Sequence, residues 1–187
     1  MKTKLLLLAA VLAVLPARAD NRAPVMDADR AFWRVPGMKT DENGFSAQFW
    51  MTTDEAVFNS WVRSGAIRNL VPAAKVKRSV PVHMALFLAN PGVRRIAMPK
   101  SEPQFFSDVS FDLYLVSPSN TLNFASRNRT AWKGTPPSPG LVSLAADRVT
   151  LNFEAIDKPG EYTIFVVLTD NVRKTTMKLE RKLELVD

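Results

Sequence analysis

Segments in which apolar and polar residues alternate are spread along the chain, and the clearest pair lies close to its end. Glu161 to Thr169 is rich in β-branched and aromatic residues, and Thr175 to Val186 resumes the alternation after a short polar break. Both segments are typical of β-strands. Asp157 to Gly160 precedes them with turn residues: Pro159 fixes one φ angle, and Gly160 permits a positive one. The pattern predicts a turn followed by a hairpin of two closing strands.

Shorter segments of the same kind recur at intervals of about ten residues, with turn residues between them. Val80 to Ala89 is apolar on both faces, which predicts a central strand. Residues 93–106 predict a loop. The remaining predicted strands are Phe45 to Met51, Val109 to Val116, Leu122 to Ala125, Thr130 to Trp132, Leu141 to Leu144 and Val149 to Phe153. Strands spaced in this way, without alternating helices, are typical of a β-sandwich.

One segment, residues 53–64, has a helical period instead. Thr52 and Glu55 have the spacing of a capping box, and Gly65 stands where such a helix would end. The apolar face of this predicted helix consists of Val57, Phe58, Trp61 and Val62. The aromatic residues of this face either bind a ligand or dock the helix on the sheet, and an amphipathic helix more often does the second.

Gly160 and Tyr162 open the penultimate strand, and a tyrosine there can hydrogen-bond back to the turn as a tyrosine corner. In this respect the chain resembles bacterial immunoglobulin-like modules. Phe58 with Trp61, Phe111 to Pro118, Trp132 with Gly134 and Pro136, and Gly160 to Asp170 also match, more loosely, a group of uncharacterised exported bacterial proteins, which the chain resembles. The predicted fold class is therefore all-β: an immunoglobulin-like antiparallel β-sandwich with one short N-terminal helix. The resemblance implies an exported sandwich and supplies no activity.

The first residues have the pattern of a secretory signal peptide. Lys2 and Lys4 form a positive start, Leu5 to Leu15 is apolar, and Ala17 to Ala19 is a small-x-small cleavage site before Asp20. The alternative, a retained membrane anchor, is disfavoured because the apolar run is short for a membrane span. We expect a signal peptide at residues 1–19, a tail or linker at 20–44 and a sandwich domain at 45–187, located in the periplasm or secreted.

The charge and the absence of cysteine narrow the classes of function. Removing Lys2, Lys4 and Arg18 lowers the formal net charge from +7 to +4, a mild excess that does not indicate nucleic acid as a partner. The chain contains no cysteine, so it has no disulfide, no thiol nucleophile and no lipid-modified cysteine after the signal peptide. A chain of 187 residues with 47% hydrophobic residues can bury a core without disulfides.

The sequence offers little catalytic chemistry. Its single histidine, His83, lies in a predicted strand, where a packed sheet residue is a simpler interpretation than a triad member without a marked nucleophile. The acidic run Asp41 to Asn43 is a sparse set of oxygen ligands for calcium. We therefore expect no enzyme, no catalytic residue, no cofactor and no metal.

Two candidate binding surfaces remain. The basic one consists of Arg173, Lys174, Lys178, Arg181 and Lys182 on the last predicted strand. It either meets an anionic partner or protects a strand edge from aggregation. The aromatic one consists of Phe105, Phe106, Trp132 and Trp50, which either bind a sugar ring or apolar peptide or belong to the core.

The sequence thus predicts a non-catalytic exported binding or accessory module that contacts a protein or a component of the cell envelope. A free strand edge would supply the backbone hydrogen bonds of such a contact. One alternative is a carbohydrate- or lipid-binding module that uses exposed aromatic residues, and another is a structural subunit of an envelope assembly. Contact with a membrane is expected to be peripheral at most, and no nucleic acid is expected as a partner.

Overall fold

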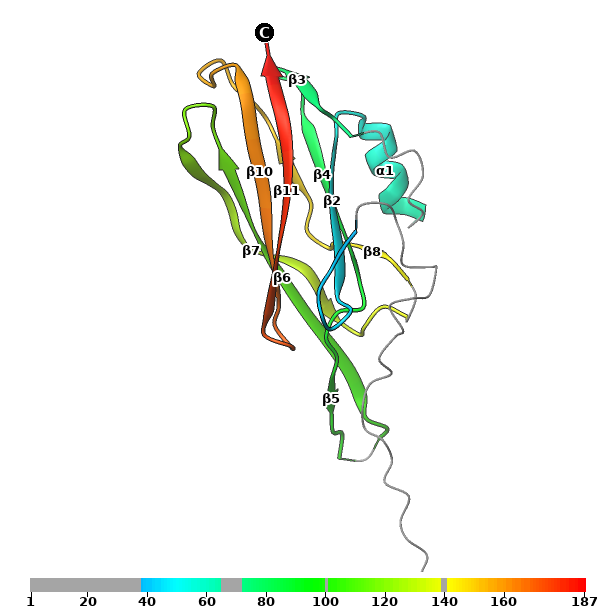
Figure 1. The fold of residues 1–187 in the computed structure, drawn as a ribbon. Helices are drawn as coiled ribbons and strands as arrows, with labels where there is room; N and C mark the ends of the chain where they lie inside the picture. Colours follow the sequence, from blue (N-terminus) through cyan, green and yellow to red (C-terminus); the bar gives the residue numbers. More distant parts are fainter. Residues whose placement is uncertain (1–37, 65–71, 100, 139–140) are drawn as a thin grey trace, which may run out of the picture.

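The computed structural model describes residues 38–64, 72–99, 101–138 and 141–187. These residues form two β-sheets that face each other, with a helix outside one of them (Figure 1). The all-β class predicted from the sequence is confirmed. The predicted signal peptide, most of the predicted tail and Gly65 lie outside the described residues.

The first sheet has the strand order β1-β2-β4-β8, and β9 also pairs with β4. Its strands are β1 (Lys39–Thr40), β2 (Ser46–Thr52), β4 (Val82–Ala89), β8 (Ser143–Leu144) and β9 (Val149–Leu151). All of its pairs are antiparallel. Strand β4 has neighbours on both sides and every one of its residues is buried, as expected for the predicted central strand. Strand β1 lies within the stretch 20–44 predicted as a tail, so the sheet begins before residue 45.

The second sheet has the order β3-β11-β10-β6-β5, and β7 also pairs with β6. Its strands are β3 (Lys75–Lys77), β5 (Arg94–Ile96), β6 (Gln104–Val116), β7 (Leu122–Gly134), β10 (Gly160–Asp170) and β11 (Thr175–Val186). Strand β3 pairs with β11 in parallel, so the prediction of a purely antiparallel arrangement is wrong at this pair. The hairpin of β10 and β11 is the predicted closing hairpin.

The core lies between the two sheets and follows from the alternation of side chains along each strand. In β10 the even-numbered residues from Tyr162 to Leu168 are buried, whereas the odd-numbered ones are partly exposed. The largest side chains that are fully buried in this core are Phe45, Phe49, Leu88, Leu113, Ile164, Leu168, Leu183 and Leu185. Both sheets contribute to one contiguous cluster, which is the principal source of stability in such a fold.

Helix α1 (Glu55–Ser64) packs on the outer face of the first sheet, where Phe58 is buried against Ala85 and Phe87. Its first turn differs from the predicted capping box. The Asp54 carboxylate, and not Thr52, accepts the hydrogen bond from the Val57 backbone N–H at 3.0 Å. The helix therefore begins at residue 55 and not at 53. The side chains of Trp61 and Val62 lie outside what the structure describes.

Two predictions about the middle of the chain are wrong. Residues 93–106, predicted as a loop, contain β5 and the first residues of β6. The two short strands predicted within 122–132 form one strand, β7. Register shifts between β6 and β7 interrupt the alternation of apolar residues. A search for alternate apolar residues therefore does not identify β7 as one continuous strand.

The turn before β10 has the contacts that the sequence predicts for it. The hydroxyl of Tyr162 donates a hydrogen bond to the Lys158 carbonyl at 2.9 Å, as in a tyrosine corner. Gly160 has a φ angle of +133°, and a Cβ atom there would lie 2.9 Å from Pro118. Both the conformation and the close approach thus favour glycine at this position. No helix within the described ranges is long and apolar enough to cross a membrane.

Candidate functional site

An open edge runs along β11 where it faces β2. Strand β3 pairs only with Glu184 to Val186, and among the described residues no strand pairs with the earlier part of β11 on that side. An unpaired strand edge presents backbone N–H and C=O groups to any extended segment that approaches it. This edge is therefore the first candidate for a binding site.

The direction of the backbone groups of β11 can be read from their contacts. The Glu184 N–H donates to the Ala74 carbonyl on the open side at 2.9 Å. The carbonyl of Lys178 accepts from the Lys39 ammonium at 3.1 Å, and the carbonyl of Glu180 accepts from the Arg181 guanidinium at 3.3 Å. In an antiparallel strand the N–H and C=O groups of one residue point to the same side, and those of the next residue point to the other side. The even-numbered residues of β11 therefore direct both groups toward the open edge.

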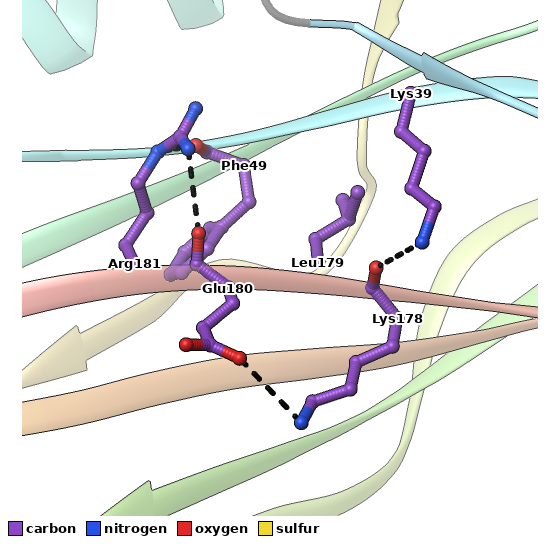
Figure 2. A pocket seen from close by; sticks show the side chains of 6 residues that line it. All are labelled: Lys39, Phe49, Lys178, Leu179, Glu180 and Arg181. Atoms are coloured by element: carbon purple, nitrogen blue, oxygen red, sulfur yellow. Dashed lines mark hydrogen bonds and ion pairs between the residues drawn. The ribbon is translucent and has the colours of Figure 1, made fainter.

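A small cavity lies between this edge and β2 (Figure 2). Its volume is about 170 Å³, and its lining consists of Lys39, Phe49, Lys178, Leu179, Glu180 and Arg181. Phe49 and Leu179 are almost wholly buried and supply an apolar base, whereas the other four side chains carry charge. We call this cavity, together with the open edge of β11, the β2–β11 groove.

Arg181 spans the groove. The odd-numbered residues around it, Leu179 and Leu183, point into the core, so Arg181 is a charged residue on the inner face of β11. Its Nε donates to the Phe49 carbonyl at 3.1 Å, and its guanidinium lies 5.7 Å from the centre of the Trp50 ring. Arg181 thus ties the edges of the two sheets together, and it lies on the opposite face of β11 from Lys178 and Lys182.

The other residues of the predicted basic surface do not form one free positive face either. The Lys178 ammonium lies 4.1 Å from the centre of the Phe165 ring and 3.5 Å from the Glu180 carboxylate. Lys182 donates to the Glu161 carboxylate at 2.6 Å, and this hydrogen bond raises the pKa of Lys182. Outer-face lysines neutralised by neighbouring carboxylates fit edge protection better than the capture of an anion.

Arg173 and Lys174 lie in the turn between β10 and β11 and not on the last strand. The Arg173 guanidinium donates to the Asn90 carbonyl at 3.0 Å and lies 3.9 Å from the buried Asp170 carboxylate. Lys174 is exposed and has a φ angle of +61°. This turn is therefore separated from Lys178 and Lys182, which lie on the outer face of the sheet.

The predicted aromatic residues are also dispersed. Phe105 is 52% exposed, and Phe106 lies under the Arg94 guanidinium at 4.7 Å. Trp132 is half-buried against the core, and its indole N–H donates to the Thr135 carbonyl at 2.9 Å. Trp50 lies on the outer face of the other sheet, beside helix α1. Only Phe105 offers most of its ring to solvent.

A third arrangement, across the outer face of the second sheet, was missed by the sequence reasoning. The rings of Tyr114 and Phe165 stack with centres 5.0 Å apart and planes 13° apart, and the Lys178 ammonium lies over the Phe165 ring, 4.1 Å from its centre. The alternation along β6 could have predicted the position of Tyr114 on the outer face, because Leu113 and Leu115 on either side of it face inward. Phe165 therefore packs across the strands against Tyr114 and Lys178, and these contacts make its ring a poor platform for a sugar.

His83 is buried on the helix-covered face of the first sheet. Its Nδ1 lies 3.2 Å from the Thr150 hydroxyl, and its ring stacks on Phe58 at 5.2 Å. The described residues contain no group of three or more histidine, aspartate or glutamate side chains arranged to hold a metal ion. The nearest acidic run, at Asp41, is engaged locally: its carboxylate accepts from the N–H groups of Asn43 and Phe45 at 2.9 Å.

The described residues define an all-β protein of two facing sheets with a groove along one open side. No protein-family model and no curated protein matches the chain. Among solved structures, a family 123 glycoside hydrolase from Clostridium perfringens, studied for glycolipid glycan hydrolysis, is similar with a TM-score of 0.41 and 7% sequence identity. The match covers 75% of this chain and 27% of that enzyme. A likeness at this level carries no inference about activity.

Proposed function

We propose that the chain is an exported, non-catalytic binding module whose partner adds an extended segment to β11 at the β2–β11 groove. The observation that carries this proposal is the row of even-numbered β11 residues whose backbone groups face an edge to which no strand of the described residues pairs. Strand addition uses such groups for affinity and uses alternate side-chain positions for specificity. The partner is a protein, or a component of the cell envelope that exposes an extended peptide.

The proposal includes the fold family and the compartment. An immunoglobulin-like sandwich is supported by the two facing sheets and by the hydrogen bond between Tyr162 and Lys158. Export to the periplasm or to the outside is supported by the signal-peptide pattern of residues 1–19. The absence of cysteine excludes a lipid-modified cysteine as an anchor.

The groove also has a physical basis for selecting its partner. An incoming strand beside β11 would place every second side chain toward the apolar base formed by Phe49 and Leu179. It would compete with Lys39 for the Lys178 carbonyl and with Arg181 for the Glu180 carbonyl. Both cations end flexible side chains, so they can move aside and pair with acidic groups of the partner instead. We therefore expect the partner segment to alternate apolar and acidic residues.

The decisive test removes one backbone N–H that points toward the open edge of β11 and leaves the other residues that line the groove unchanged. In Glu180→Pro the backbone donor is lost, and proline is tolerated on a strand edge where that donor has no partner in the sheet. Glu180→Ala is the matched control, because it removes the same side chain and keeps the N–H. Tagged, signal-processed protein would be cross-linked mildly in its native envelope and then captured by affinity.

We expect wild type and Glu180→Ala to retain one dominant protein partner and Glu180→Pro to lose it. Circular dichroism and the denaturation midpoint would establish that the proline variant is folded. Retention of the same partner by folded Glu180→Pro would overturn strand addition at this edge. A preparation of wild type without any protein partner would overturn the binding function itself.

A further inference from the structure

A second feature, separate from the β2–β11 groove, is the hairpin of β5 and the first residues of β6, which we call the arm. Strand β5 pairs with Gln104 to Phe106 of β6, whereas β10 begins to pair with β6 at Val109 and β7 ends beside Ser107. Within the described residues, this short hairpin is therefore not joined by a third strand. Figure 1 shows it projecting beyond the two sheets, at the end of the molecule opposite the C-terminus.

The base of the arm is held by buried hydrogen bonds. The Ser107 hydroxyl donates to the Gly92 carbonyl at 2.7 Å, and the Gly92 N–H donates to the Asp170 carboxylate at 2.6 Å. Ser107 and Asp170 are both fully buried. These contacts fix the two strands of the arm to the β10–β11 turn, so the arm projects in a defined direction.

The arm combines exposed apolar and cationic side chains. Phe105 is 52% exposed and Met98 is 39% exposed. Arg94 and Arg95 lie directly across the hairpin from Phe106 and Phe105. Glu102 is the single acidic residue in the described part of 93–106, so positive charge exceeds negative charge on the arm.

We propose that this arm docks on an anionic phospholipid surface, with Phe105 and Met98 entering the boundary between headgroups and acyl chains. Amphipathic elements that carry arginine beside apolar residues bind membrane interfaces in this way, through burial of apolar surface and attraction to anionic lipids. A sugar site is a poorer fit, because small-molecule sites are concave and surround the ligand with oriented polar groups, whereas this arm projects from the body.

The contact is peripheral and reversible. One aromatic ring, one thioether and a small excess of cationic charge make a weak anchor, and salt screens the electrostatic part of it. The proposal concerns a membrane contact and does not depend on the partner of the β2–β11 groove.

The test is co-sedimentation of the signal-processed chain, beginning at Asp20, with large unilamellar vesicles. One set contains phosphatidylglycerol mixed with phosphatidylcholine, and the other contains phosphatidylcholine alone. We expect binding to the anionic vesicles that falls with added salt, and little binding to the neutral ones. Phe105→Ala lowers the partition coefficient about tenfold, since the ring is the main apolar contact. Arg94→Gln lowers it several-fold.

Two controls remove equivalent groups from the other end of the molecule. Ile156 is 86% exposed, and it lies in the turn before β10, whose first residue pairs with Leu185 near the C-terminus. Ile156→Ala therefore removes an exposed apolar side chain away from the arm, and Lys158→Gln removes one positive charge there. We expect both to bind like wild type, and Glu180→Pro as well.

Absence of binding by wild type to anionic vesicles would overturn the proposal. Equal losses in Phe105→Ala and Ile156→Ala, or in Arg94→Gln and Lys158→Gln, would also overturn it, because the effect would then be non-specific. Failure of this test leaves the result of the envelope capture unaffected, so the two proposals are separable.

Discussion

The carboxylate of Asp170 and the backbone N–H of Gly92 lie 2.6 Å apart in the interior of the protein, 78 residues apart in the chain. The other oxygen of the same carboxylate accepts from the N–H groups of Val172 and Arg173, each at 3.0 Å. Asp170 is completely buried. One carboxylate therefore satisfies donors of the β10–β11 turn and of the segment after β4, and so joins the closing hairpin to the base of the arm.

Asp170→Ala is expected to lower the free energy of unfolding by about 3 kcal/mol, because it leaves several buried donors without an acceptor. Asp112→Ala is the control, since Asp112 accepts from the Asn128 N–H at 2.7 Å in a more exposed position, and we expect a loss of about 1 kcal/mol there. Urea denaturation measures both values. Equal losses would show that the buried position of Asp170 confers no special role.

Gly92→Ala tests the same contact from the other side. A Cβ atom at this position would lie 2.7 Å from both carboxylate oxygens of Asp170, so the two segments must separate. We expect a loss of about 2 kcal/mol from this overpacking. In an Asp170→Ala background the same substitution should cost less, and the double-mutant cycle gives the coupling. Strict additivity of the two changes would contradict the steric explanation.

The hydrogen bond from Tyr162 to the Lys158 carbonyl makes a prediction about pH. Burial raises the pKa of Tyr162, and the neighbouring Asp157 carboxylate acts in the same direction. In the unfolded chain the phenol ionises near pH 10. Above that pH the unfolded state loses its proton first, so the stability that Tyr162 contributes falls as the pH rises.

Tyr162→Phe should therefore destabilise the protein by about 1 kcal/mol at neutral pH, where the phenol is protonated and donates its hydrogen bond. The difference between wild type and the variant should shrink above a pH of about 10, because phenylalanine does not titrate. Denaturation of both proteins across this range measures the difference directly, and the lysines that titrate there affect both proteins alike. A difference that stays constant with pH would contradict the role assigned to the phenol.

The sequence predicts an element correctly where the pattern of the element's own residues is sufficient to identify it. It fails where the element forms only through contacts with residues distant in the chain. The closing hairpin was predicted at its observed place because apolar residues alternate along both of its strands, with Arg181 as the exception in the second strand, and because its turn contains Pro159 and Gly160. Strand β5 was missed because Arg94 to Ile96 is short and charged, and it becomes a strand only through pairing with β6. The β2–β11 groove was not foreseen, since it depends on where two distant strands meet.

Arg181 shows the same limit at the level of one residue. Its charge placed it with Lys178 and Lys182 in one predicted basic surface, although its odd-numbered position, shared with Leu179 and Leu183, already indicated the inner face. The hydrogen bond to the Phe49 carbonyl at 3.1 Å explains this position. It joins residues that are 132 apart in the chain, so no local sequence pattern predicts it.

The start of helix α1 gives a further prediction. Since the Asp54 carboxylate caps the helix, Asp54→Ala should destabilise the protein by about 1 kcal/mol. Glu55→Ala, which the capping-box interpretation would make damaging, should have a smaller effect, because Glu55 acts only as a negative charge in the first turn. Thermal unfolding followed by circular dichroism compares the two variants. The reverse order would restore the capping box of Thr52 and Glu55.

Arg181 also makes a prediction about self-association. A charge that points inward from an edge strand discourages pairing with the same edge of another molecule. Arg181→Leu removes this charge and its bond to Phe49, and it leaves a more apolar groove beside N–H groups that pair with no strand in the described part of the chain. We expect the weight-average mass in sedimentation velocity to rise above that of wild type, whereas Arg181→Lys, which keeps the charge, should behave like wild type.

The association of Arg181→Leu should also depend on the backbone of β11. If molecules pair through this edge, adding Glu180→Pro to Arg181→Leu removes a required donor and restores the mass of wild type. Adding Glu180→Ala should not restore it, because the N–H remains. Association that persists in the proline double variant would mean that molecules meet through another apolar surface. The outcome thus shows whether the open edge of β11 is able to accept a strand, which is the property that the proposed function requires.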